Sequence, residues 1–159
     1  MADEISIRRA TRADLDGAAA LAARLVRMHH EVDPRRFFLP ENVAQGYAGW
    51  FRQELARREA VILVALAGET ITGYAYATLE GKDWNMLLDG HGAIHDIFVD
   101  ESARRRGAGL LLMQAIIREL EALGASRIVL STMVGNESAQ RLFERVGFRR
   151  TMLEMTRGG

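Results

Sequence analysis

Two kinds of hydrophobic spacing alternate along the chain. Short runs of apolar residues, some alternating with polar ones, predict strands over residues 5–9, 60–67, 71–80, 97–99, 126–132 and 148–156. Apolar residues that recur every three or four positions predict helices over about residues 15–30, 41–58, 110–123 and 136–146. The order β-α-α-β-β-β-α-β-α-β predicts an α/β fold with a mixed central sheet, an early antiparallel hairpin, a later parallel βαβ unit and helices on both faces.

Local signals mark several element ends. The segment Thr11-Arg-Ala-Asp14 has the spacing of a capping box, with Asp in the position usually held by Glu. Asn136 is a good N-cap for the last helix, and Gly124 stands where a helix commonly ends. Prolines predict that the segment from His29 to Pro40, between the first two helices, is irregular.

The bulk properties set the class of protein. A length of 159 residues favours one domain, and Lys+Arg equals Asp+Glu at 21 each, so no global field favours nucleic acid or an anionic membrane. The chain has no cysteine, which excludes disulfides and a catalytic thiol. The first residues lack the features of a signal peptide, and no apolar run reaches membrane-spanning length. We therefore expect a cytoplasmic protein with neither a membrane nor a nucleic acid as partner.

A turn rich in arginine and glycine follows the strand predicted over residues 97–99. It reads Arg104-Arg-Arg-Gly-Ala-Gly109, and a helix comes directly after it. Free backbone N–H groups and the positive end of a helix dipole meet at such a turn, which predicts an anion site. The turn lacks the Gly-Lys-Ser/Thr of a Walker loop and the third glycine of the dinucleotide fingerprint, so neither ATP nor NAD is the expected ligand.

The spacing Arg-x-x-Gly-x-Gly resembles the acyl-CoA-binding motif of the GNAT superfamily of N-acetyltransferases. A second stretch, Asn136-x-x-Ala139-x-x-Leu142-Phe143-x-x-x-Gly147-Phe148, also matches that family. The family has the same order of elements, so the resemblance covers essentially residues 1–159 as one acetyltransferase domain.

The resemblance implies a set of residues that hold acetyl-CoA as co-substrate. Backbone N–H groups of the turn would hold the pyrophosphate, and the residues are Arg104, Arg105, Arg106, Gly107, Ala108, Gly109 and Leu110. The strand backbone would pair with the pantetheine arm and supply an oxyanion donor, from Ile97, Phe98 and Val99. The last helix would line the same arm with Asn136 and Ala139, and would place Phe143 beside the leaving sulfur.

Two polar residues on the central strand are the candidate catalytic bases. His95 and Asp96 precede the run at 97–99, and strand alternation predicts that they point to opposite faces. Histidine titrates near neutral pH, which suits a base that deprotonates an ammonium group. The sequence leaves open which of the two is the base, and whether either is only hydrogen-bonded in the core. His91 is a weaker alternative.

The general acid is not evident. Many family members carry a tyrosine at the position of Phe143, and phenylalanine cannot donate a proton. Tyr74, Tyr76, Thr132 or a water molecule are the substitutes, and a thiolate, with a thiol pKa of about 8.5, is itself a tolerable leaving group.

Two functions remain in competition. The first is an N-acetyltransferase that acts on a primary amine, small molecule or peptide, by direct attack in a ternary complex. The second is a catalytically weak acyl-CoA-binding sensor or interaction module, which the lack of a tyrosine at Phe143 favours. The predicted final strand, residues 149–157, also offers an edge for a homodimer.

The acceptor is open, although acidic side chains would suit a cationic amine if they converge. They are Glu31, Asp33, Asp83, Asp89 and Asp96. The adjacent His29 and His30 lack the spacing of metal ligands, so we expect no metal site.

Overall fold

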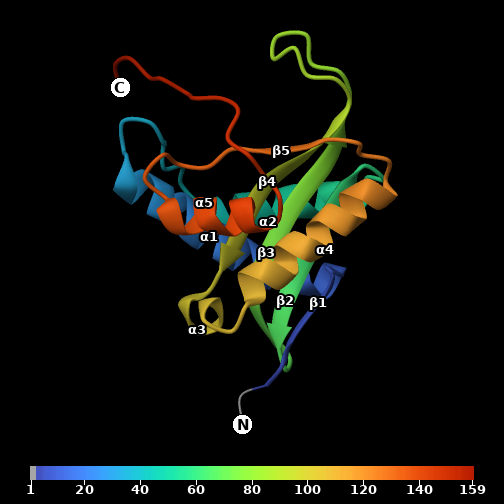
Figure 1. Ribbon diagram of the computed structural model, residues 1–159. Coiled ribbons are helices and arrows are strands. Elements are labelled where there is room, and N and C mark those ends of the chain that lie inside the picture. The colour runs from blue at the N-terminus through green and yellow to red at the C-terminus, as the bar shows by residue number, and fades with distance from the viewer. Residues whose placement is uncertain (1–2) are drawn as a thin grey trace.

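The computed structural model describes residues 3–159, which form a twisted sheet with helices on both faces (Figure 1). The strands are β1 (Ile5–Arg9), β2 (Ala60–Ala67), β3 (Thr70–Glu80), β4 (His91–Val99) and β5 (Ile128–Leu130). They lie side by side in that order, the first four antiparallel and β5 parallel to β4. The predicted mixed sheet is therefore confirmed.

The helices form two layers. Helices α1 (Leu15–Val32) and α2 (Val43–Leu55) cover one face, and α4 (Ala108–Ala122) and α5 (Glu137–Arg145) cover the other (Figure 1). Two short helical turns, η1 (Arg12–Asp14) and α3 (Glu101–Arg104), precede α1 and α4. None of the helices in residues 3–159 is long and apolar enough to cross a membrane.

Strand β2 shows why the sheet is buried on both sides. Successive side chains of a strand point to opposite faces. Val61, Leu63 and Ala65 pack in the core under α4, whereas Ile62 and Val64 pack in the core under α1 and α2. The unbroken apolar run of this strand thus serves two cores, as expected for a strand covered on both faces.

The prediction of a strand over residues 148–156 is wrong. These residues have no regular secondary structure, and Met152, Leu153 and Met155 are between 70% and 86% exposed. An alternating sequence becomes a strand only where it pairs with a sheet edge and buries one face. The neighbouring strand β5 is three residues long, so it offers little edge. The segment instead contacts the loop after α1, where Arg36 pairs with Glu154.

The homodimer expected from that strand stays a prediction. Smaller differences concern lengths: β5 is shorter than the predicted 126–132, α2 is shorter than the predicted 41–58, and β4 is longer than the predicted 97–99.

The capping box at the start of the helical region is confirmed. The Asp14 carboxylate accepts hydrogen bonds from the backbone N–H of Thr11 at 2.7 Å and from the Arg8 guanidinium at 2.6 and 3.0 Å. These bonds, led by the one from Arg8, hold the pKa of Asp14 at about 2, below its ordinary value. Asp14 therefore ties β1 to the start of α1.

Asp14→Asn is expected to lower the free energy of unfolding by about 1–2 kcal/mol at neutral pH, since a charged cap is lost. The lowered pKa makes this contribution complete above the usual Asp pKa of about 3.9, and it is lost as the pH falls toward 2. Urea unfolding from pH 7 to pH 2 should show the two proteins converging in acid. A difference that stays constant over this range would contradict the role given to Asp14.

Candidate functional site

The arginine–glycine turn lies at the N-terminus of α4, as the sequence predicts. Gly107 has φ of 77°, a left-handed conformation that favours glycine. In the described chain, the first backbone bond of α4 is donated by Leu111 to the Gly107 carbonyl at 3.1 Å. The N–H groups of Ala108, Gly109 and Leu110 precede it and have no partner in the helix, as at any helix start. The turn therefore has the geometry that favours an anion.

The turn also packs closely against its neighbours. A side chain at Gly109 would bring its Cβ to 3.2 Å from Leu142 Cδ2 of α5, so the start of α4 lies directly against α5. Arg104 donates from Nε to the Val99 carbonyl at 2.9 Å, and its guanidinium lies 5.6 Å from the ring centre of Phe98. One donor of Arg104 thus fixes the turn to the end of β4.

Strand β4 has an open edge beside this turn. On one edge, Ile97, Phe98 and Val99 pair with β3. On the other edge, β5 pairs only with residues 92–94. Within residues 3–159, the backbone of residues 95–99 therefore has no neighbouring strand on that side, and such an edge can bind an extended ligand by strand addition.

The two other predicted contacts with acetyl-CoA lie on α5. The Asn136 side chain accepts from the Ala139 N–H at 3.1 Å, which confirms the predicted N-cap. Phe143 is buried in the core under α4 and packs edge-on against Phe148, with ring centres 6.3 Å apart. The contacts of Asn136, Ala139 and Phe143 with acetyl-CoA stay predictions.

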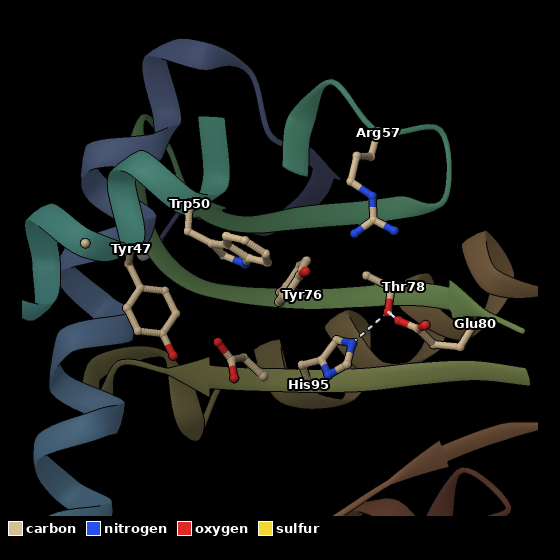
Figure 2. Close-up of a pocket in the computed structure, with 9 residues that line it drawn as sticks. Tyr47, Trp50, Arg57, Tyr76, Thr78, Glu80 and His95 are labelled. Carbon is tan, nitrogen blue, oxygen red and sulfur yellow. Dashed lines mark hydrogen bonds between the residues drawn. The ribbon is translucent and has the colours of Figure 1, made fainter. Parts of the chain in front are cut away.

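A pocket of about 480 Å³ lies where α2 crosses β3 and β4 (Figure 2). Its walls combine aromatic, acidic and basic side chains, and its lining consists of Gly46, Tyr47, Trp50, Arg57, Tyr76, Thr78, Glu80, His95 and Asp96. Most of these residues are far apart in the sequence, so the sheet and α2 together create the pocket.

His95 and Asp96 both line this pocket, and the prediction that they point to opposite faces is wrong. Asp96 pairs with Tyr76 and Ile94 pairs with Ala77, so His95 has no partner on β3. Such an extra residue is a β-bulge, which interrupts the alternation and re-aims side chains. The bulge brings both candidate bases to one cavity.

The Asp96 carboxylate lies in enclosed surroundings. It accepts from the Tyr74 hydroxyl at 3.0 Å, and Tyr74 is fully buried. Burial raises the pKa of Asp96 above its ordinary value, although the Tyr74 hydrogen bond and the nearby His95 and His29 act in the opposite direction. Burial, together with the Asp96 charge, also raises the pKa of Tyr74 and of Tyr47.

Arg57 is held at the pocket wall by a buried acid. Glu54 is 2% exposed, and its oxygens accept from Arg57 Nη1 at 3.0 and 2.9 Å. Glu54 also accepts from the Tyr76 hydroxyl. The two partners compensate the burial of the Glu54 charge and fix Arg57 and Tyr76 in place.

His95 is joined to strand β3 by a hydrogen bond. Its Nε2 lies 2.7 Å from Thr78 Oγ1, and Thr78 Oγ1 donates to Glu80 Oε1 at 2.5 Å (Figure 2). The His95 ring also lies over Tyr76, with ring centres 5.1 Å apart.

Other residues singled out from the sequence lie elsewhere. His91 is buried, and its Nδ1 bonds the backbone carbonyl of Asp89. His29 and His30 bond backbone carbonyls through Nδ1. Of the acids proposed to converge, only Asp96 lines the pocket, since the lining contains none of Glu31, Asp33, Asp83 and Asp89, and it also lacks Thr132.

Sequence reasoning missed six lining residues, Gly46, Tyr47, Trp50, Arg57, Thr78 and Glu80. Trp50 and Tyr47 read as core residues of an amphipathic helix. Thr78 and Glu80 look like ordinary members of a strand. A signal was present in the alternation of Tyr74, Tyr76, Thr78 and Glu80, which places four polar-tipped side chains on one face of β3.

The structure thus combines a helix N-terminus that favours an anion, an open strand edge on β4 and an adjoining pocket. Residues 25–148 match the model of the Acetyltransferase (GNAT) family. The chain therefore belongs to this family and is an acetyl-CoA-dependent N-acetyltransferase.

Known proteins agree with this assignment. The chain is 30% identical over 132 residues to an N-alpha-acetyltransferase of Sulfurisphaera tokodaii, covering 80% of this chain and 77% of that protein. It is 30% identical over 100 residues to mycothiol acetyltransferase of Corynebacterium diphtheriae, covering 62% of this chain but only 30% of that longer protein. The aminoglycoside N-acetyltransferase AAC(6')-Iy, solved in complex with CoA, shares the fold with a TM-score of 0.75 and 19% identity over 100% of this chain and 96% of that one.

Gly109→Glu is expected to abolish binding of acetyl-CoA, because a carboxylate at the start of α4 repels the pyrophosphate predicted there. Gly109→Ala is the control, since its Cβ meets the same Leu142 side chain without adding charge. Titration calorimetry and thermal unfolding on both variants separate charge from packing. If the folded glutamate variant binds acetyl-CoA as the alanine variant does, the pyrophosphate lies elsewhere.

Phe143→Tyr is expected to lower the free energy of unfolding by about 1–3 kcal/mol without raising kcat, because the new hydroxyl is buried in an apolar core. Phe148→Tyr, at a less buried position, should cost less. Thermal unfolding and turnover measured on the same samples test this. A higher kcat at low pH would instead place the Phe143 ring beside the leaving sulfur.

Proposed function

We propose that the protein transfers an acetyl group from acetyl-CoA to a primary amine by direct attack in a ternary complex. The neutral amine nitrogen bonds to the thioester carbonyl carbon, the carbon–sulfur bond breaks, and CoA leaves as thiolate. The nitrogen gives up its extra proton as the amide forms, and the departing thiolate takes it up. The observation that carries this proposal is the bulge in β4, which directs His95 and Asp96 into one pocket on the strand predicted to bind the acyl donor.

The donor side follows the residues predicted from the sequence. Amides of residues 104–110 hold the pyrophosphate, with help from the arginine side chains, and the open edge of β4 at 97–99 pairs with the pantetheine arm. Asn136, Ala139 and Phe143 line that arm from α5. A backbone N–H near Ile97 or Phe98 stabilises the oxyanion.

The acceptor side has the charge of a site for a cationic amine. Glu54 balances Arg57, but within residues 3–159 neither Asp96 nor Glu80 forms an ion pair with Lys or Arg. The pocket is thus net negative, and the rings of Tyr47, Trp50 and Tyr76 can hold an ammonium group or the apolar body that carries it. Its volume is in the range of small-molecule sites.

The two candidate bases have different roles in this proposal. His95 is solvent-exposed, and its Nδ1 makes no hydrogen bond with any residue from 3 to 159, so it takes the proton from the bound ammonium. Asp96 attracts and holds the ammonium group. The hydroxyl protons of Tyr74 and Tyr76 are already donated to Asp96 and Glu54, which disfavours them as acids and supports departure of the thiolate.

The alternative function, an acyl-CoA-binding sensor, is favoured by phenylalanine in place of tyrosine at position 143, since phenylalanine cannot act as the acid. A sensor that binds only acyl-CoA gives no reason for the pocket that His95 and Asp96 line beside the predicted donor site. Release of CoA thiol in the presence of a panel of cationic primary amines distinguishes the two functions. Binding of acetyl-CoA without turnover of any amine would favour the sensor.

His95→Ala and Asp96→Asn are expected to impair different kinetic constants. Loss of the base should lower kcat by about 10²–10⁴-fold, whereas loss of the Asp96 charge should mainly raise KM for the amine, by about tenfold. Steady-state kinetics with a saturating amine separates the two effects. Wild-type kcat in His95→Ala would show that the proton leaves by another path.

Asp96→Asn should also raise the thermal midpoint at neutral pH. Because burial raises the pKa of Asp96, the native state binds this proton more tightly than the unfolded chain does. The contribution of Asp96 to stability is therefore fullest below the usual Asp pKa of about 3.9 and is lost as the pH rises through the raised value. The gain from the substitution should disappear in acid, and an equal gain at all pH values would contradict the burial of the charge.

A further inference from the structure

A line of three side chains runs along the edge of the pocket and ends at the predicted base. His95 Nε2 lies 2.7 Å from Thr78 Oγ1, and Thr78 Oγ1 lies 2.5 Å from Glu80 Oε1 (Figure 2). Thr78 is 1% exposed and stands between a histidine and an acid that both reach solvent. The three residues belong to two adjacent strands, so the sheet itself fixes their spacing.

The direction of each hydrogen bond follows from the number of protons available. A hydroxyl group has one proton to donate, and an ionised carboxylate can only accept. Thr78 therefore donates to Glu80, and its oxygen must accept from His95. His95 Nε2 thus carries a proton, which leaves the lone pair of the neutral imidazole on Nδ1.

We propose that Thr78 and Glu80 are positioning residues that fix the tautomer and orientation of His95, so that Nδ1 is the atom that accepts the proton from the amine. This inference rests on the proposed role of His95 in acetyl transfer. When the amine proton moves to Nδ1, His95 becomes an imidazolium ion and Nε2–H continues to donate to Thr78. The proton of Thr78 stays on its oxygen, and Glu80 stays ionised.

Glu80 strengthens the hydrogen bond between His95 Nε2–H and Thr78. The hydroxyl transmits the effect, because its donation to a carboxylate makes its oxygen a stronger acceptor for Nε2–H. A charge-assisted bond of this kind is stronger than a neutral one. Packing of the His95 ring on the Tyr76 ring further limits the rotation of the imidazole. The bulge otherwise leaves His95 without a partner on β3, so this side-chain link is what holds it to that strand.

The decisive substitutions are Thr78→Val and Thr78→Ser. Valine keeps the shape of the buried side chain and removes the hydroxyl, whereas serine keeps the hydroxyl. We expect kcat to fall by about 10- to 100-fold in Thr78→Val, the range for loss of one hydrogen bond to a charged group, and to stay near wild type in Thr78→Ser. Thermal unfolding of both variants checks that the fold is retained.

A spectroscopic measurement does not depend on turnover. Nitrogen-15 NMR of the histidine side chains at a pH where His95 is neutral should show Nε2–H in the wild type and in Thr78→Ser. Thr78→Val should show a larger fraction of the Nδ1–H tautomer than the wild type does. A wild type in which His95 carries its proton on Nδ1 would overturn the proposal even if acetyl transfer by His95 is confirmed.

The role of Glu80 is tested by Glu80→Gln, with Glu69→Gln as the matched control. Glu69 is an exposed acid in the turn before β3 and does not line the pocket. In the wild-type background, Glu80→Gln should lower kcat. In a His95→Ala background, the same substitution should not lower kcat further, because the effects of residues that act as a unit are not additive. Equal losses in both backgrounds would show that Glu80 acts without His95. If His95→Ala alone has no effect on kcat, the proposed function of His95 fails, while the NMR result still decides the hydrogen-bond direction.

Discussion

Strand β4 has one residue more than β3 between the pairs Tyr76–Asp96 and Ala77–Ile94, and that residue is His95. A bulge of this kind bends a strand and increases its local twist. The pairing of β4 with β5 ends at Ile94, directly before the bulge. One irregularity therefore accompanies both parts of the candidate site. These are the open edge of β4 and the pocket that His95 and Asp96 both line.

The rest of the structure holds this irregular strand in position. Cores on both faces of the sheet bury the strands around it, and Phe98 and Val99 anchor the end of β4 in opposite cores. The α3 turn and the start of α4 follow at once, and Arg104 bonds back to the Val99 carbonyl. The arginine–glycine turn and the two predicted bases are thus separated by a short piece of strand, which suits the proposed donor, whose pyrophosphate and thioester lie at the two ends of its pantetheine arm.

The pocket is built partly from buried polar and charged side chains, which a sheet with a purely structural role would not need. Buried Glu54 is satisfied by Arg57 and Tyr76, and Asp96 is satisfied by Tyr74. Burial nevertheless raises the pKa of Asp96, so the ionised form of this carboxyl costs stability in the folded protein. Perturbed groups that converge on one cavity are more typical of functional sites than of packing.

Local patterns in the sequence determined the helices, most of the strands and the capping box at Asp14, because periodicity and capping depend on residues a few positions apart. The turn from Arg104 to Gly109 was readable for the same reason, since its residues are contiguous. The absence of a final strand, the shared direction of His95 and Asp96, and the network of Glu54, Arg57 and Tyr76 were decided by tertiary structure. A strand needs an edge to pair with, a bulge exists only in the register of two strands, and a pocket wall requires side chains from α2 and β3 to meet.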